Sequence, residues 1–371
     1  MEIEPPAKRL KLTPEPESST FADLAEQRDA EERQKYIKGK KIGSGQYADV
    51  FSAHLASDPT KLFAIKKIKT GPEVQEFGIS YDSLREIRFL QELHHENIIK
   101  LHSVFSTKNQ NLNLVLEYLP QGDLLTLIQD NSVFYTAADI KMWMMQLGRA
   151  VYFCHGFGVL HRDIKPNNLL IASSGQIKLA DFGLARKMAD PFQQMTYNTI
   201  TLWYRPPELF FQAQHYSGNV DIWSCGCVFA ELILRDVMFR AVPQTELKMI
   251  SLISERVGTP TEQNWPGVSH LKGYVVSGDV IPLRSRESWN NSFRSVGPAG
   301  VDLLIKMLTL DPRKRPTAEG VLKHEYWTSD PRPSRLEDLP RKGGGETTMA
   351  HDLAQKQDRG KVSRLIDFSK V

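Results

Sequence analysis

The stretch His161-Arg162-Asp163-Ile164-Lys165-Pro166-Asn167-Asn168-Leu169-Leu170 decides the fold of this chain. Its pattern is H-R-D-x-K-x-x-N followed by two apolar residues. Transfer of a phosphoryl group to a hydroxyl needs a carboxylate that orients the attacking oxygen and accepts its proton, and Asp163 has this chemistry. It also needs an oxygen ligand for Mg²⁺, which Asn168 can supply, while Lys165 brings a positive charge to the transferring group. The stretch therefore predicts phosphoryl transfer.

A second motif, Asp181-Phe182-Gly183, follows at a distance that a hairpin can close. Short apolar runs at Leu169–Ile171 and 176–179 flank the turn Ser173-Ser174-Gly175, which is a hairpin signature. Such a hairpin returns Asp181 to Asn168, so that both reach one metal ion. Each motif alone is common by chance, but the two at this spacing are specific. Together they resemble the catalytic and metal-binding loops of eukaryotic protein kinases.

The composition is that of a chain with a sizeable core: 371 residues, 41% hydrophobic and 25% charged. A net charge of +3 does not argue for nucleic-acid binding. No apolar run is long enough for a membrane span, and no signal peptide is expected. The three cysteines are too few for a disulfide scaffold and indicate a reducing compartment. Cys225 and Cys227 favour a buried helix over half a zinc site, because no second cysteine pair completes four ligands.

Both ends of the chain differ in composition from its centre. Residues 1–34 are rich in Pro, Glu and Ser and are predicted to be mostly disordered, with a short helix over Phe21–Gln34. Within them, Pro5-Pro6-Ala7-Lys8-Arg9-Leu10-Lys11-Leu12 is either a solvated tail or a nuclear import signal, and its similarity to short basic import sequences favours the signal. Residues 328–371 are rich in Pro, Gly and charge and are expected to be extended or disordered.

The folded region opens with a small β-rich lobe, residues 35–119. Ile42-Gly43-Ser44-Gly45-Gln46-Tyr47-Ala48-Asp49-Val50 is a Gly-x-Gly turn that lets backbone amides approach the phosphates of ATP. A dinucleotide-binding turn would open a helix, but a strand pattern follows here. Lys66, about 20 residues further on, is the expected phosphate-pairing lysine. Ala48 stands where the general pattern has a third glycine.

Three further elements complete this lobe. Tyr81–Glu92 has apolar residues at helical spacing and predicts an amphipathic helix, on which Glu86 is the expected partner of Lys66. Strands are expected at Leu101–Ser106 and Leu112–Glu117. The second strand leads into a linker, Glu117-Tyr118-Leu119, whose peptide groups can hold adenine, with Leu116 at the back of the pocket. By the resemblance to protein kinases, the nucleotide is expected against Ile42, Gly43, Ser44, Gly45, Gln46, Tyr47, Ala48, Val50, Ala64, Lys66, Leu116, Glu117, Leu119, Asn168 and Leu170.

Residues 120–327 predict a larger, mainly helical lobe. A long helix is expected over 137–157, and its apolar stripe is interpreted as core. His161 is expected to support the catalytic loop through its ring hydrogen bonds, because His94, His95 and His161 fit no metal-ligand spacing. Glu208 and Arg315 are expected to form a buried ion pair.

Over residues 36–327 the chain resembles a bilobal α+β protein kinase, and more narrowly a cyclin-dependent kinase. Ser83-Leu84-Arg85-Glu86-Ile87 resembles the cyclin-contacting helix of that family. A second stretch is close to the sequence typical of the family: Thr201-Leu202-Trp203-Tyr204-Arg205-Pro206-Pro207-Glu208. Ala138-Asp139-Ile140-Lys141 and Lys165-Pro166-Asn167-Asn168 are similar to the fungal kinase of general transcription factor IIH, the cyclin-dependent kinase seven type. Residues 79–83 and Leu202 depart from the family pattern.

The resemblance implies ATP and Mg²⁺ as cofactors and transfer of the γ-phosphoryl group to Ser or Thr, followed by proline. It implies as substrates the repeated tail of RNA polymerase II and other cyclin-dependent kinases. The implied partners are a cyclin, an assembly factor and the transcription factor IIH complex, in the nucleus and without direct nucleic-acid contact. A cell-cycle-type kinase and a pseudokinase scaffold remain alternatives. The metal ligands it implies are Asn168 and Asp181, and the catalytic residues are Asp163, Lys165, Lys66, Glu86 and Thr201.

Three arginines, Arg85, Arg162 and Arg186, come from separate segments and have no obvious carboxylate partners nearby in the sequence. Guanidinium groups that converge in this way suit a phosphate of about −2 charge. Thr196 is the expected phosphorylation site, because residues 187–195 contain no Ser or Thr.

The helix that carries Glu86 has a hydrophobic face partly built for another protein. Without a cyclin, nothing is expected to press this helix inward. The Lys66–Glu86 ion pair is therefore predicted to be absent or long in the isolated chain.

Overall fold

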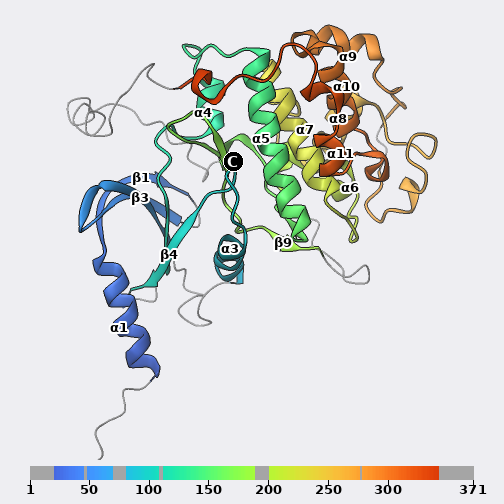
Figure 1. Cartoon of the computed structure of the whole chain (residues 1–371). Coiled ribbons are helices and arrows are strands. Elements are labelled where there is room, and N and C mark those ends of the chain that lie inside the picture. Colours follow the sequence, from blue (N-terminus) through green and yellow to red (C-terminus); the bar gives the residue numbers. More distant parts are fainter. Residues whose placement is uncertain are drawn as a thin grey trace, which may run out of the picture.

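The computed structural model describes residues 21–45, 48–69, 81–107, 112–188, 200–275 and 278–341. A small lobe built on one sheet stands beside a larger helical lobe (Figure 1). This is the predicted bilobal α+β architecture. Several predicted features lie outside the described residues: the expected import signal at 5–12, Gln46, Tyr47, Thr196 and the tail from 342 onward.

The sheet of the small lobe is antiparallel, with strand order β1-β2-β3-β5-β4. In β3, Phe63 and Ile65 join a small apolar cluster on one face, whereas Ala64 faces the main core on the other. Because side chains alternate along a strand, Lys66 lies on the same face as Ala64. The strands are β1 Tyr36–Ser44, β2 Ala48–Leu55, β3 Asp58–Ile68, β4 Leu101–Ser106 and β5 Leu112–Glu117.

Helix α3, Tyr81–Glu92, and strands β4 and β5 have the predicted bounds. The apolar face of α3 buries Phe89 and Leu90 in the main core, and Leu93 just beyond the helix joins them. Helix α1, Phe21–Gln34, also matches its prediction and packs along β4 through a hydrogen bond between Asp29 and Ser106. β4 therefore contacts both α1 and α3.

Two long helices, α5 and α7, form the centre of the large lobe. Helix α5 begins at a capping box in which the Thr136 and Asp139 side chains each accept from the other's backbone, and it ends one residue earlier than predicted. Most of its apolar stripe, Trp143 included, is buried as expected, and Phe153 is half-buried. The helices of this lobe are α4 Leu124–Gln129, α5 Ala137–Gly156, α6 Pro207–Phe210, α7 Asn219–Leu234, α8 Glu246–Val257, α9 Arg286–Phe293, α10 Gly297–Met307 and α11 Ala318–Leu322.

The cysteines are core residues. Cys225 and Cys227 are buried on α7, and burial raises the pKa of both thiols. Both cysteines are buried residues of one helix, so the buried-helix interpretation is confirmed. Within the described residues no group of three His, Cys, Asp or Glu side chains could hold a metal ion. No described helix is long and apolar enough to cross a membrane.

The predicted hairpin is present as β7, Leu169–Ile171, and β8, Ile177–Leu179. Leu169 pairs with Leu179, and Gly175 at the turn has a φ of 82°, a conformation that favours glycine. The amide of Ala180 donates to the carbonyl of Asn168 at 2.9 Å. The hairpin therefore returns the chain before Asp181 to Asn168.

Candidate active site

The backbone of the catalytic loop is held from below by Asp221 of α7. Its carboxylate is fully buried and accepts from the amides of His161 (3.0 Å) and Arg162 (2.8 Å). His155 Nε2 lies 2.9 Å from Asp221 Oδ2. Burial alone would raise the pKa of Asp221, but the hydrogen bond and charge of His155 hold it below its ordinary value. Asp221 thus stabilises the loop where Arg162 has a φ of 64°.

His161 supports the loop through its ring, as predicted. Its Nε2 donates to the carbonyl of Ala180 at 3.1 Å, which leaves Nδ1 to accept from the amide of Asp163 at 3.2 Å. The ring also packs edge-on against Phe182. Burial lowers the pKa of His161, in agreement with a neutral ring that donates at one nitrogen and accepts at the other.

Four of the expected site residues form one hydrogen-bonded set around Asp163. Its Oδ1 accepts from Thr201 Oγ1 at 2.8 Å, and its Oδ2 lies 2.8 Å from both Lys165 Nζ and Asn168 Nδ2. Lys165 Nζ also donates to Thr201 Oγ1 at 3.0 Å. A buried carboxylate is thus surrounded by a cation, a hydroxyl and an amide, which is suitable for holding a second hydroxyl and taking its proton.

Asn168, a member of this set, and Asp181 each carry an oxygen atom that could bind a cation. Asn168 Nδ2 donates to both the backbone carbonyl and the carboxylate of Asp163, which leaves the amide oxygen for a cation. Asp181 has a half-exposed carboxylate on a residue with a φ of 64°. Burial raises its pKa, but Lys66 outweighs that effect and holds the pKa below its ordinary value. One carboxylate and one amide oxygen fit Mg²⁺, which takes few protein ligands beside phosphates and water.

The Lys66–Glu86 ion pair is closed. Lys66 Nζ lies 2.7 and 2.9 Å from the two carboxylate oxygens of Glu86, and 3.0 Å from Asp181 Oδ1. The prediction of an absent or long pair is wrong for this structure. The physical reason is that Phe89 and Leu90 already fix α3 against the core, so that the Glu86 carboxylate is buried and needs Lys66 as its counter-charge.

The glycine turn and the linker flank these charged groups. Gly45 donates its amide to the carbonyl of Ala48 at 2.8 Å, which closes the turn. Val50 pairs with Lys66 across β2 and β3, and Ala64 pairs with Leu116 across β3 and β5.

The linker is tied to the hairpin. Glu117 Oε1 lies 2.9 Å from Lys178 Nζ and accepts from the amide of Lys100 at 2.8 Å. Four residues after this linker, Asp123 forms an antiparallel bridge with Leu170 of β7. The Lys178–Glu117 pair was not predicted, because the partners are 61 residues apart.

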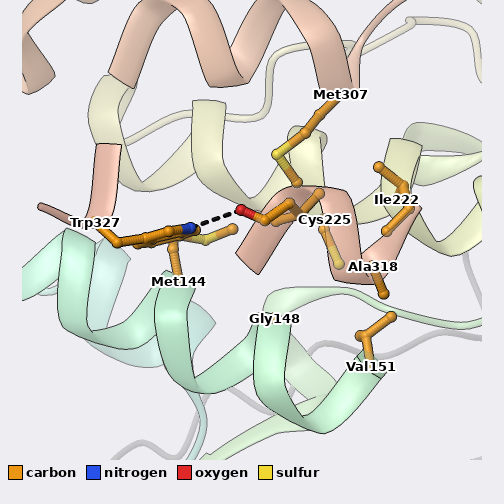
Figure 2. Close-up of a pocket in the computed structure, with 9 residues that line it drawn as sticks. Met144, Gly148, Val151, Ile222, Cys225, Met307, Ala318 and Trp327 are labelled. Carbon is orange, nitrogen blue, oxygen red and sulfur yellow. Dashed lines mark hydrogen bonds between the residues drawn. The ribbon is translucent and has the colours of Figure 1, made fainter. Parts of the chain in front are cut away.

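A small cavity lies elsewhere, in the core of the large lobe (Figure 2). Its volume is about 10 Å³, room for one water at most, and its lining is apolar, so it is a packing gap and not a nucleotide site. The residues that line it are Met144, Gly148, Val151, Ile222, Cys225, Met307, Ala318, Val321 and Trp327.

The three arginines expected to read a phosphate have different surroundings. Arg85 Nη1 lies 3.0 Å from Asp82 Oδ1, so the expectation that it has no nearby carboxylate partner is wrong. The physical reason is that residues three apart on a helix are neighbours on its surface.

The other two arginines contact neutral groups or lie on a strand. Arg162 donates to the carbonyl of Leu184 and to the Tyr216 hydroxyl. Arg186 lies on β9, Arg186–Lys187, paired with β6, Val159–Leu160.

Two buried carboxylates hold the segment after Thr201. Glu208 and Arg315 form the predicted ion pair, with Nη2 at 2.7 Å from Oε2 and both side chains buried. Glu231 of α7, which lies in none of the recognised motifs, accepts from the Tyr204 hydroxyl at 2.8 Å. Burial raises the pKa of Glu231 to about 7.

Residues 36–327 match the protein kinase domain family. The chain belongs to the protein kinase family. This kinase is 42% identical over 335 residues to serine/threonine-protein kinase crk1 of Schizosaccharomyces pombe, covering 90% of this chain and 97% of crk1. It is 40% identical over 307 residues to cyclin-dependent kinase D-1 of Arabidopsis thaliana, covering 83% of this chain and 74% of that protein.

A solved structure agrees in fold as well as in sequence. A chain of the CAK complex of Chaetomium thermophilum, bound to ATP-gamma-S, superposes with a TM-score of 0.83 and is 53% identical. The match covers 88% of this kinase and all of that chain. These relatives place the kinase among the cyclin-dependent kinases of the fungal CAK type.

Proposed function

We propose that this chain is a cyclin-dependent serine/threonine kinase that transfers the γ-phosphoryl group of ATP to a Ser or Thr hydroxyl followed by proline. The observation that carries the proposal is the hydrogen-bonded set of Asp163, Lys165, Asn168 and Thr201 beside Lys66 and Asp181. These groups combine a proton acceptor, two cations and two oxygen ligands for a metal ion, which is the equipment of phosphoryl transfer.

Asp163 orients the attacking hydroxyl and takes its proton as the oxygen bonds to the γ-phosphorus and ADP leaves. Lys165, 2.8 Å from Asp163, neutralises charge on the transferring group. Thr201, whose hydroxyl binds both side chains, fixes their relative positions.

ATP is proposed to lie between the glycine turn and the linker. The backbone of the glycine turn would approach its phosphates, and Lys66, fixed by Glu86, would pair with them. The other proposed contacts are Ile42, Ser44, Gln46, Tyr47, Ala48, Val50, Ala64, Leu116, Glu117, Leu119 and Leu170. Asn168 and Asp181 would hold Mg²⁺, which supplies charge neutralisation to the phosphates when bound.

The proposed regulatory partner is a cyclin, docked on α3. Two apolar side chains of that helix are exposed, Tyr81 at 80% and Leu84 at 47%. Exposed apolar residues grouped on one helix mark a protein contact. Thr196 is the proposed activating phosphorylation site, read by Arg85, Arg162 and Arg186.

The substrates proposed are the repeated C-terminal tail of RNA polymerase II and other cyclin-dependent kinases. The similarity to a chain of a CAK complex supports the second class. An assembly factor and the transcription factor IIH complex belong to the same proposal. A nuclear location is also proposed, supported by the basic residues Lys8, Arg9 and Lys11.

The test is phosphate incorporation into a peptide of Ser-Pro repeats by the full chain purified with its cyclin. Asp163→Asn should bind ATP as before and lose turnover by at least ~10²-fold. Asp236→Asn, an exposed carboxylate change on the same lobe, is the matched control and should retain activity. Near-normal turnover by Asp163→Asn would contradict the mechanism, and no transfer by the unaltered complex would favour a pseudokinase scaffold.

A further inference from the structure

The chain stays in contact with the large lobe beyond residue 327, where the family match ends. Residues 329–341, called here the C-terminal strap, run back across the start of α5 (Figure 1). Ser334 donates its amide to the carbonyl of Ala138 at 3.1 Å and its hydroxyl to Asp139 Oδ1 at 2.6 Å. Lys141, a fully buried lysine on α5, donates to the carbonyl of Ser329 at 2.9 Å. Lys141 also donates to the Ser329 hydroxyl at 3.1 Å, so four polar contacts fasten the strap to one helix.

The strap ends on the catalytic hairpin. Leu339 is 3% exposed, although it follows a stretch of exposed residues, and it packs on the β7–β8 turn. A side chain at Gly175 would begin 2.6 Å from Leu339 Cβ, so the contact is as close as glycine permits. Trp143 of α5 donates to the carbonyl of Gly175 at 3.1 Å. The turn is therefore held by Trp143 and by Leu339.

This hairpin is the covalent link between the two proposed metal ligands. Asn168 directly precedes β7, and Asp181 lies two residues after β8. The base of the hairpin is fixed by Asn97, whose Nδ2 donates to the carbonyl of Ile177 at 3.0 Å and whose own carbonyl accepts from the amide of Leu179 at 2.8 Å. The strap supplies the corresponding support at the turn.

We propose that Leu339 is a positioning residue that acts on the Asn168–Asp181 pair through the β7–β8 turn. The part of the chain needed for catalysis then extends to residue 339, past residue 327, where the match to the kinase family ends. The inference rests on the proposed kinase function. A strap that only covered apolar surface would add stability and would leave the affinity for metal and nucleotide unchanged.

The experiment uses the full chain purified with its cyclin and compares Leu339→Ala with the unaltered protein. Leu336→Ala is the control, because Leu336 lies on the same strap but is 41% exposed. The first readout is the Mg²⁺ concentration that half-saturates binding of a fluorescent ATP analogue. The second is hydrogen–deuterium exchange of the hairpin amides without nucleotide. The third is kcat and KM for ATP and for peptide.

For Leu339→Ala we expect about a tenfold rise in the half-saturating Mg²⁺ concentration, the lower end of what lost support around a metal ligand costs. Exchange at the hairpin should become faster, and KM for the peptide should stay the same. Leu339→Met should restore both readouts, and Leu336→Ala should match the unaltered protein. Leu339→Val, which removes less volume, should change both in the same direction if the alanine variant does not fold.

Unchanged Mg²⁺ dependence and hairpin exchange in folded Leu339→Ala or Leu339→Val would overturn the inference alone, even if the melting temperature fell. If the unaltered complex bound no Mg-nucleotide, the proposed function would fail and the inference with it.

Discussion

Asp221→Asn should disturb the catalytic loop without touching any substrate. The Asp221 carboxylate receives the amides of His161 and Arg162 on different oxygen atoms, with His155 beside one of them. Asparagine has one acceptor oxygen, so at least one buried amide must face an NH₂ group. A buried donor left without an acceptor costs about 1–3 kcal/mol.

The backbone acts in the opposite direction. Arg162 has a φ of 64°, a conformation that costs a non-glycine residue about 1–3 kcal/mol and that is already present in the unaltered protein. Movement of the loop would relieve part of this strain, so we expect the free energy of unfolding to fall by about 1–3 kcal/mol at most. Asp163 follows Arg162 directly, and a shift of about 1 Å at a catalytic group can lower the rate about 10²-fold.

The assay is urea unfolding at pH 7, followed by circular dichroism, together with kcat for a peptide substrate. Asp236→Asn, which exchanges an exposed carboxylate two residues past the end of α7, should change the unfolding free energy by less than about 0.5 kcal/mol. If Asp221→Asn also stayed within that range and kept kcat within about twofold, the loop would not depend on Asp221.

The remaining predictions concern two buried carboxylates and the proposed phosphorylation of Thr196. Glu208→Ala leaves Arg315 buried without a counter-charge and should lower the free energy of unfolding by about 3–5 kcal/mol in urea, and a loss under about 1 kcal/mol would contradict this. The pKa of Glu231 in the folded protein is raised to about 7, so its protonation stabilises the fold at low pH, and this stabilisation is lost as pH rises through 7. The stability of Glu231→Gln relative to the unaltered protein should therefore increase from pH 5 to pH 8. A stability difference that stayed constant over this range would refute the raised pKa. If Thr196 carries the phosphate that Arg85 reads, Thr196→Ala and Arg85→Ala together should cost little more activity than either alone, and full additivity would exclude the pairing.

Local pattern was enough to predict much of this kinase. The spacing between Asn168 and Asp181, with a turn at Gly175, predicted a hairpin that the structure contains. Apolar periodicity predicted the bounds of Tyr81–Glu92, because the helix is defined by neighbours three and four residues apart. The same helical spacing places Asp82 beside Arg85. This carboxylate is close in the sequence, and the expectation that Arg85 has no carboxylate partner did not take it into account.

Tertiary packing decided what depends on contacts between distant segments. The Lys66–Glu86 pair is closed because core packing fixes α3, whereas the exposed face of that helix alone had suggested an open pair. Asp221 is 59 residues from Arg162, and Leu339 is far in sequence from the turn at Gly175. Composition predicted an extended or disordered chain for residues 328–371, yet Leu339, which lies among the described residues of this range, is buried on that turn. Sequence patterns report which groups are present and their local spacing, whereas burial and long-range hydrogen bonds exist only once the chain is packed.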